Sequence, residues 1–284
     1  MPNCAIKLFA DDINIFLHNS SLHRLVSDAQ MTVDLLTEWF RANMLSVSLT
    51  KTCYSLFGLK SINNVDICVK IDNCKLQHVY SCKYLGVIID EQLNWREHID
   101  HVYGKLIKFT GLFYKIRDLM SWKILKMLYF SFIDSQLLYG VEIYGNSCGT
   151  FFTKLTTLNN KILRILQNKP YDTRTTDLYR TYCTLPVLKL HEFRVLLLMH
   201  KFVHHKDKLP NVFNNYFVSN DSVHMYDTRH RTDLHRHRIN TSYGYRCLKY
   251  KGIKMWNSLP NSFKYIKSTT RFKRLVKNYL LMTV

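Results

Sequence analysis

The first ninety residues alternate between short apolar runs and polar turns, a pattern typical of β-hairpins. Residues 4–9 and 13–17 form two such runs, and Ala10, Asp11 and Asp12 join them. The pattern therefore predicts a hairpin that carries two adjacent carboxylates at its tip.

A long amphipathic helix is predicted over residues 21–42, because apolar side chains recur there every three or four positions. Asn43 is expected to take the left-handed conformation that ends this helix. A second hairpin is predicted around the Asp72–Asn73 turn, and a further strand over residues 84–89 contains Gly86.

Beyond residue 95 the apolar positions change to helical spacing. The helices predicted from this spacing cover residues 95–120, 121–138, 151–167, 189–205 and 270–282. Residues 206–245 show no sustained period and are predicted to form a long basic loop.

These elements predict the α+β fold class. We expect a partial antiparallel sheet with a packed helix over residues 1–94, a helical segment over 95–146 and a mostly helical basic region over 147–284. No apolar run approaches the ~20 residues of a membrane span. No charged and then apolar leader precedes Cys4, so an intracellular protein of the nucleus or cytoplasm is expected.

The positive charge is concentrated in one half of the chain. Residues 1–150 hold 15 basic and 14 acidic side chains, whereas residues 151–284 hold 25 and 7, a net charge of +18. Such an excess indicates a polyanionic partner, because Lys and Arg neutralise phosphates and release counterions. Nucleic acid is the first candidate and an anionic membrane surface is the second.

The eight cysteines show no pairwise spacing typical of a structural zinc site. We interpret them as reduced thiols, most of them buried as small apolar side chains.

The Asp11–Asp12 pair is the sharpest chemical feature of the sequence. Adjacent carboxylates repel each other, which makes them a poor choice for a purely structural turn. Carboxylate oxygens are preferred ligands of Mg²⁺, so the pair is a candidate metal site. A solvated turn without a metal is the alternative interpretation of the dipeptide alone.

Residues 8–12, Leu-Phe-Ala-Asp-Asp, resemble the palm motif Tyr/Phe-Ala-Asp-Asp of reverse transcriptases, in the version found in non-LTR (LINE-type, jockey-like) retrotransposons. Further segments follow in the order and at the spacing of that family. They lie at residues 39–52, 83–99, 138–145, 228–229 and 256–273. Asn43, Leu45, Lys51 and Thr52 match the family stretch N-x-L-x-x-N-x-x-K-T, and Ser48 stands where Asn is usual.

The resemblance implies a role for each matching residue. Asp11 would be a metal ligand, and Asp12 would be a weaker ligand or an electrostatic neighbour. Lys51 would protonate the leaving pyrophosphate. The primer grip would consist of Tyr84, Leu85 and Gly86.

Residues 1–94 would then be the C-terminal half of the palm, 95–146 the thumb and 147–284 the basic tail. Positively charged side chains of the thumb and tail would contact nucleic acid. These are Lys105, Lys108, Lys115, Arg117, Arg229, Arg231, Arg236 and Arg238. The family activity is RNA-directed DNA synthesis, with Mg²⁺, deoxynucleotides, an RNA template that can be the element's own transcript, and a nicked DNA primer.

The sequence also departs from the family pattern. A reverse transcriptase needs another catalytic Asp from an earlier strand, and none of the ten residues before Asp11 is acidic. We therefore expect a polymerase fragment that does not polymerise by itself. The alternatives are a non-catalytic nucleic-acid-binding protein derived from thumb and tail, or a reading frame without a selected function.

Two other clusters are candidate sites. The first is a group of histidines with an i, i+4 pair, a spacing that could bind zinc: His191, His200, His204 and His205. No HExxH motif or Cys pair supports a zinc site, so a surface or core role is favoured. The run His235–Arg238 is flanked by aromatic side chains, a combination suited to single-stranded nucleic acid. These are Tyr226, Tyr243, Tyr245 and Tyr250. A packing role is expected for the Trp256–Pro260 segment.

Overall fold

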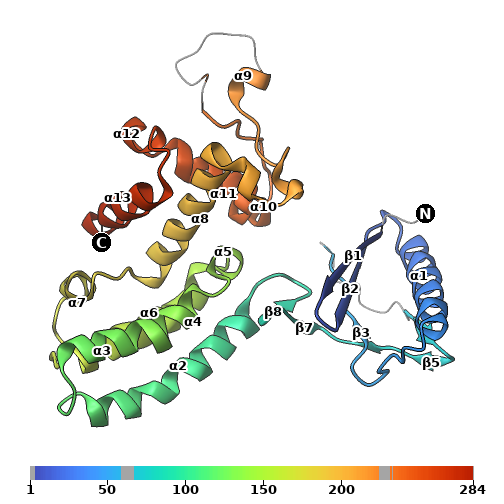
Figure 1. Ribbon diagram of the computed structural model, residues 1–284, viewed down its shortest axis with the longest axis horizontal. Coiled ribbons are helices and arrows are strands. Elements are labelled where there is room, and N and C mark those ends of the chain that lie inside the picture. Colours follow the sequence, from blue (N-terminus) through green and yellow to red (C-terminus); the bar gives the residue numbers. More distant parts are fainter. Residues whose placement is uncertain (1–3, 59–66, 224–230, 232, 284) are drawn as a thin grey trace. The chain divides into compact units, whose positions relative to one another are not determined.

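The computed structural model describes residues 4–58, 67–223, 231 and 233–283. The chain forms two compact units, Met1–Leu93 and Asn94–Val284. The first holds small sheets and one long helix and the second is helical, so the predicted α+β class is confirmed (Figure 1). The division into palm, thumb and tail stays a prediction.

Over its described residues, 4–58 and 67–93, the first unit contains four two-stranded sheets and helix α1, Leu22–Ala42. The antiparallel pairs are β1 with β2, β4 with β5 and β7 with β8, whereas β3 and β6 pair in parallel. The strands are β1 Cys4–Phe9, β2 Asp12–Leu17, β3 Cys53–Tyr54, β4 Lys70–Ile71, β5 Cys74–Lys75, β6 Gln77–His78, β7 Ser81–Tyr84 and β8 Val87–Asp90.

The core of this unit lies between α1 and the β4–β5 hairpin. Val69, Ile71 and Leu76 are buried there. The amide of Gln30 on α1 pairs with the backbone of Lys70, since its Nε2 donates to the Lys70 carbonyl at 3.0 Å and its Oε1 accepts from the Lys70 amide at 2.8 Å. This double hydrogen bond fixes α1 against the hairpin.

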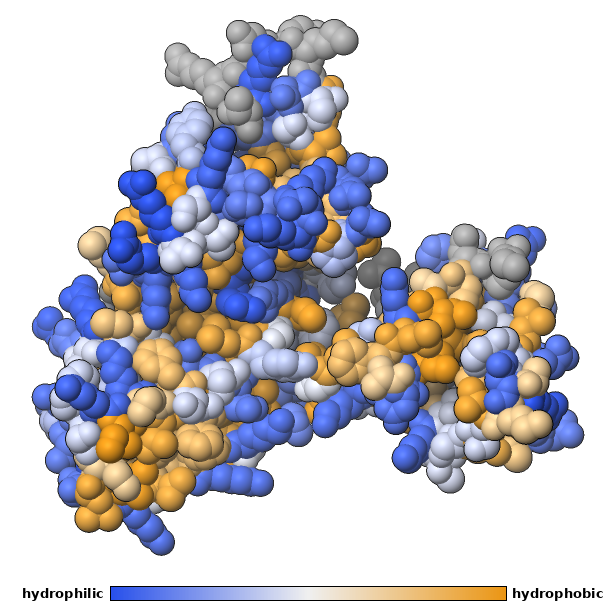
Figure 2. All heavy atoms as spheres, viewed as in Figure 1, coloured by the Kyte–Doolittle hydropathy of each residue, from blue (hydrophilic) through white to orange (hydrophobic). Residues whose placement is uncertain are grey.

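The rest of α1 and the first hairpin remain largely exposed. Leu8 and Phe9 on β1 are 70% and 61% exposed, although their apolar pattern predicts burial. The reason is that, among the described strands, β1 pairs only with β2, so the sheet does not continue beyond the hairpin there. Figure 2 shows the apolar surface that results on this unit.

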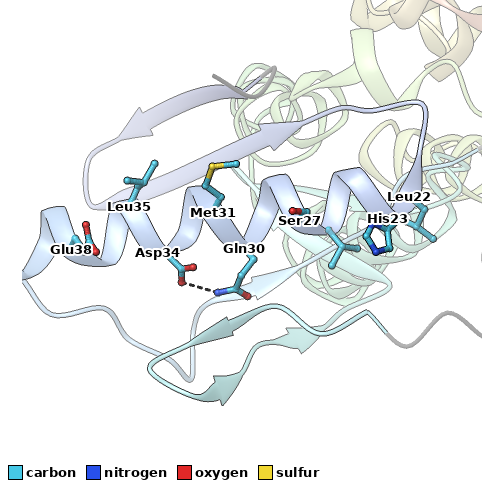
Figure 3. Close-up of a pocket in the computed structure, with 9 residues that line it drawn as sticks. Leu22, His23, Ser27, Gln30, Met31, Asp34, Leu35 and Glu38 are labelled. Carbon is cyan, nitrogen blue, oxygen red and sulfur yellow. Dashed lines mark hydrogen bonds between the residues drawn. The ribbon is translucent and has the colours of Figure 1, made fainter.

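A shallow groove runs along one side of α1 (Figure 3). Apolar side chains such as Met31 and Leu35 line it together with polar ones, and Gln30 Nε2 donates to Asp34 Oδ1 at 2.7 Å within it.

The second unit is built on the contacts of α2 with α6 and of α8 with α11 and α13. Its apolar stripes form the core, as the helical spacing predicts: Ile99, Leu106 and Phe113 of α2 have no exposed surface. The helices are α2 Arg96–Ile116, α3 Trp122–Leu128, α4 Ser135–Leu138, α5 Val141–Tyr144, α6 Gly149–Leu166, α7 Thr175–Tyr182, α8 Val187–His204, α9 Asn220–Val223, α10 Ser242–Arg246, α11 Leu248–Asn257, α12 Asn261–Lys264 and α13 Thr269–Met282. A π-helix, Tyr129–Asp134, joins α3 to α4, and 3₁₀ turns occupy Lys206–Lys208 and Asn211–Phe213.

Several local predictions are wrong in detail. The expected strand over 84–89 is a hairpin, because Leu85 and Gly86 take left-handed φ values of 46° and 82° and form its two-residue turn. Asn43 is not left-handed; Met44, with φ 54°, takes that position. The helix predicted to residue 120 ends at Ile116.

The segment 206–245 is less irregular than predicted, since α9, α10 and two 3₁₀ turns interrupt it.

The cysteines are free thiols, but none of the eight is buried: each is exposed or half-buried, which contradicts the expected core role. Six of the eight begin a strand or cap a helix, whereas Cys68 lies in a loop and Cys82 lies within β7. Trp256 and Leu259 are buried as expected. No helix within the described ranges is long and apolar enough to cross a membrane.

Candidate functional site

The Asp11–Asp12 pair occupies the tip of the β1–β2 hairpin, as predicted. Asp12 begins β2 and pairs with Phe9, so Ala10 and Asp11 form the two-residue turn. Ala10 takes φ 51°, a left-handed conformation that costs a residue other than glycine about 1–2 kcal/mol. Both carboxylates are exposed to solvent. The hairpin therefore presents two negative charges on a tight, strained turn.

These carboxylates fit part of a magnesium site. Their oxygens are the hard ligands that Mg²⁺ takes, and exposure leaves them free to bind. Among the residues that the structure describes, no group of three or more His, Cys, Asp or Glu side chains is placed to hold a metal. Asp11 and Asp12 thus offer two protein ligands out of the near-octahedral set that Mg²⁺ requires.

The turn of the β7–β8 hairpin contacts the Asp-Asp hairpin through two aromatic rings. Tyr84 at the end of β7 lies edge-to-face with Phe16 of β2, with ring centroids 6.0 Å apart. Alternate residues of a strand share a face, so Phe16 lies on the side of β2 that carries Asp12 and Asn14. The structure therefore packs Tyr84 against the hairpin that carries the carboxylates, at Phe16, four residues along β2 from Asp12.

Phe16 itself was missed as a site residue. The only available signal was the period of two that places it four residues beyond Asp12 on one face. Such a signal does not tell which segment packs against that face.

Lys51 is an exposed residue in a tight turn. Its backbone amide donates to the Ser48 carbonyl at 3.1 Å, and the Thr52 hydroxyl donates to the same carbonyl at 2.8 Å. These bonds shape the turn, and the long side chain of Lys51 extends from it into solvent. The Ser48 carbonyl therefore accepts hydrogen bonds from both residues of the Lys51–Thr52 motif.

The candidate cations of α2 lie on its solvent side. Lys105, Lys108 and Lys115 are exposed. Arg117 is different, because its guanidinium lies 4.2 Å from the Tyr114 ring centroid and 3.3 Å from Asp118. Arg117 is therefore partly engaged within the helix terminus.

The described candidate cations of the tail lie on both sides of Leu234, which forms a β-bridge with Ser219. Arg231, Arg236 and Arg238 are exposed, and Arg236 lies over the ring of Tyr250, 5.6 Å from its centroid. Arg229 lies outside the described residues.

Three comparisons with known proteins bear on this arrangement. No protein-family model matches the chain, and no solved structure matches it. Curated relatives do match. The chain is 26% identical over 211 residues, or 72% of its length, to the RNA-directed DNA polymerase from mobile element jockey of Drosophila funebris. It is 23% identical over 62% of its length to the probable RNA-directed DNA polymerases from transposon BS and from transposon X-element of Drosophila melanogaster.

The chain is thus similar to several curated non-LTR retrotransposon RNA-directed DNA polymerases. It spans about a fifth of the length of these curated relatives: 22%, 20% and 19%. The resemblance stated from the motifs is thereby confirmed.

The candidate zinc-binding histidines near the end of α8 hold a loop in place. The Nε2 atoms of His200, His204 and His205 lie 2.7–2.8 Å from the carbonyls of Ile266, Lys264 and Lys267. We call these three residues the histidine clamp. Their engagement with backbone carbonyls supports the structural interpretation, in which the end of α8 fixes the segment between α12 and α13.

His191 makes the stability of the second unit depend on pH. Burial, together with the charge of Lys251, lowers the pKa of His191 to about 4, against the opposing effect of the hydrogen bond between its ring and the Val141 carbonyl. The neutral ring binds fewer protons than an unfolded histidine, whose pKa is about 6.5. Its contribution is therefore present above pH 6.5 and lost as the pH falls towards 4.

We expect the free energy of unfolding to fall by about 2 kcal/mol between pH 7 and pH 5 through His191 alone. Urea unfolding followed by circular dichroism at both pH values measures it. The variant His191→Gln should lose this part of the pH dependence, and the exposed His237→Gln should retain it. Equal pH dependence in the wild type and His191→Gln would contradict the assignment.

Proposed function

We propose that this chain is part of a non-LTR retrotransposon RNA-directed DNA polymerase. Residues 1–94 would form half of the palm, 95–146 the thumb and 147–284 a basic nucleic-acid-binding tail. The contact of Tyr84 with the Asp12 face of β2 carries the proposal. It packs Tyr84, one of the primer-grip candidates, against the hairpin whose tip carries Asp11 and Asp12.

Each site residue then has a chemical task. Asp11, with Asp12 as the weaker ligand, would hold Mg²⁺, which when bound supplies charge neutralisation at the reacting phosphate. Lys51, exposed on a flexible side chain, would deliver a proton to the leaving pyrophosphate. Tyr84, Leu85 and Gly86 would position the primer end, where glycine in the turn permits close approach of a sugar-phosphate backbone.

The proposed nucleic-acid contacts come from two groups of cations. The thumb would contribute Lys105, Lys108, Lys115 and Arg117, and the tail Arg229, Arg231, Arg236 and Arg238. The partners would be an RNA template, such as the element's own transcript, and a nicked DNA primer. The nucleus or cytoplasm would be the place of action.

We further propose that the 284 residues do not extend a primer by themselves. Asp11 and Asp12 are the two carboxylates that the tip of this hairpin supplies. A two-metal site needs more oxygen ligands than this hairpin provides. Another part of a longer polymerase would supply them.

The test combines binding and extension. The purified chain is incubated with primed RNA, deoxynucleotides and Mg²⁺, and binding is measured from about 50 to 200 mM salt. We expect no extension, and an affinity that falls at least ~10-fold over this range. Asp11→Asn should remove the Mg²⁺ dependence of primed-template binding, whereas the exposed Glu38→Gln on α1 should not.

Two outcomes would change the proposal. Extension by the wild-type chain that disappears in Asp11→Asn would overturn the proposed inactivity. Salt-dependent binding that ignores both Mg²⁺ and Asp11 would instead favour the alternative, a non-catalytic nucleic-acid-binding protein.

A further inference from the structure

The last part of the chain has an unusual charge distribution. After Asp233 no acidic side chain occurs to the end of the sequence, while twelve Lys and Arg residues do. Asp233 itself forms an ion pair with Lys264 at 3.1 Å. Hydrophilic side chains cover much of the visible surface of this part of the second unit (Figure 2). Burial lowers the pKa of Lys251 on α11, and Glu192 of α8 lies close enough to that lysine to act in the opposite direction, but the many cations of this segment still make the potential around α10 and α11 positive.

Helix α10 is a short but well-defined element within this region. The Thr241 hydroxyl caps it by accepting from the Gly244 amide at 3.1 Å. A Cβ at Gly244 would lie 2.3 Å from Cγ2 of Ile239, so only glycine permits this packing. The close approach fixes the positions of Tyr243 and Tyr245 on either side of Gly244.

Cations and rings alternate across this surface. Arg236 lies over Tyr250, whose ring meets that of Tyr245 edge-to-face at 5.0 Å. Lys249 lies 5.7 Å from the ring centroid of Tyr216. The loop at 235–238 and the first turn of α11 thus lie beside α10, although the sequence separates them.

Tyr243 and Tyr245 remain open to solvent, with 41% and 50% of their surface exposed. An exposed tyrosine ring offers a face on which an unpaired base can stack, and nearby Lys and Arg pair with the phosphates. A duplex keeps its bases stacked internally, so it offers phosphates and groove edges to such a surface but no base faces for stacking.

A membrane is a poorer fit for the same charges. Interfacial binding needs Trp, Phe or Leu side chains that enter the acyl region. From residue 233 to 283, the exposed large apolar side chains are Tyr243, Tyr245, Tyr265 and Met282. Three of these four are tyrosines, which suit stacking better than insertion.

We propose that this surface binds single-stranded nucleic acid. The tyrosine–arginine surface consists of Arg236, Arg238, Tyr243, Tyr245, Arg246 and Lys249. The tyrosines stack on unpaired bases and the cations hold the backbone. The inference rests on the proposed function of the tail, and it adds the unpaired form of the ligand and the residues that select it.

The test uses the full chain and three labelled probes of equal length, oligo(U), oligo(dT) and a DNA duplex, with binding followed by fluorescence anisotropy. The double variant Tyr243→Ala/Tyr245→Ala should lose about 10-fold or more in affinity for both single strands and little for the duplex. The control Tyr265→Ala removes a tyrosine that is 79% exposed and should bind like the wild type. The variant Arg236→Gln/Arg238→Gln should weaken all three probes and reduce the salt slope.

Two single substitutions separate stacking from folding. Tyr245→Phe keeps the aromatic face and should bind like the wild type, whereas Tyr245→Leu keeps bulk without that face and should bind more weakly. Equal affinities of these two variants would overturn the stacking role. A preference for oligo(U) over oligo(dT) identifies RNA as the ligand, and equal affinity identifies unpaired nucleic acid in general.

Failure of the inference and failure of the proposed function are distinguishable. A wild-type chain that binds none of the three probes contradicts the nucleic-acid-binding tail itself. A chain that binds them all, with the tyrosine variants equal to Tyr265→Ala, contradicts this inference alone. Phosphatidylserine vesicles form a separate arm, and tyrosine-dependent binding to vesicles but not to oligonucleotides would assign the surface to membranes instead.

Discussion

Replacing Phe272 with alanine is expected to destabilise the helical unit by about 3–5 kcal/mol. Phe272 on α13 has no exposed surface. Its ring stacks on His200 at 4.2 Å between centroids and lies 5.8 Å from Trp256. Alanine would leave a cavity between α8, α11 and α13 and would remove the stacking partner of a histidine in the clamp.

Urea unfolding followed by far-ultraviolet circular dichroism measures this loss. Tyr265→Ala is the matched control, because it removes an aromatic ring that is 79% exposed and should change the free energy of unfolding by less than about 0.5 kcal/mol. Similar midpoints for the two variants would show that α13 does not contribute to the cooperative core.

The second large effect is expected for Gly145→Ala, a loss of about 3 kcal/mol. A Cβ at this position would lie 2.3 Å from the Val141 carbonyl oxygen and close to the His191 ring as well. The Gly145 amide donates to that same carbonyl at 2.9 Å, and the His191 ring lies 2.9 Å from it. Neither the backbone nor the buried ring can move without breaking one of these bonds.

Gly111→Ala on α2 is the control for this prediction. A Cβ there meets no atom within 4 Å, and alanine within a helix gains about 0.5–1 kcal/mol over glycine. The two substitutions therefore add the same methyl group with opposite expected signs. If Gly145→Ala unfolds at the same urea concentration as Gly111→Ala, the close packing at Gly145 is refuted.

The helices that were predicted well are those with a long, regular apolar stripe. Helices α1, α6, α8 and α13 begin and end within about two residues of their predicted limits. Periodicity is a local property, and a stripe of this length leaves few other ways of burying it. The short helices α7 and α11 were missed, because eight or ten residues show too little of a period to stand out.

The turn at Leu85–Gly86 shows a different limit. A continuous apolar run over 84–89 predicts one strand, yet the chain reverses within it. The signal was present in Gly86, which suits the left-handed turn, but the apolar residues on both sides obscured it. Pairing between β7 and β8 decided the outcome.

Part of the candidate site could likewise be predicted from the sequence, and part could not. The carboxylate tip at Asp11 and Asp12 follows directly from two apolar runs and the residues between them, and the family motif is a matter of sequence alone. The contact between Tyr84 and Phe16 is not, because 68 residues separate the two rings and no local pattern specifies which faces meet.

By itself, the sequence determined the mixed fold class, the long helices, the hairpin tip with its paired acids and the confinement of positive charge to one half. These depend on neighbours along the chain. Only the tertiary structure decided that Tyr84 lies on the Asp12 face, that the histidine clamp binds carbonyls and that α10 presents tyrosines among arginines. Such features depend on side chains far apart in sequence meeting in space, where packing and desolvation select one partner from many.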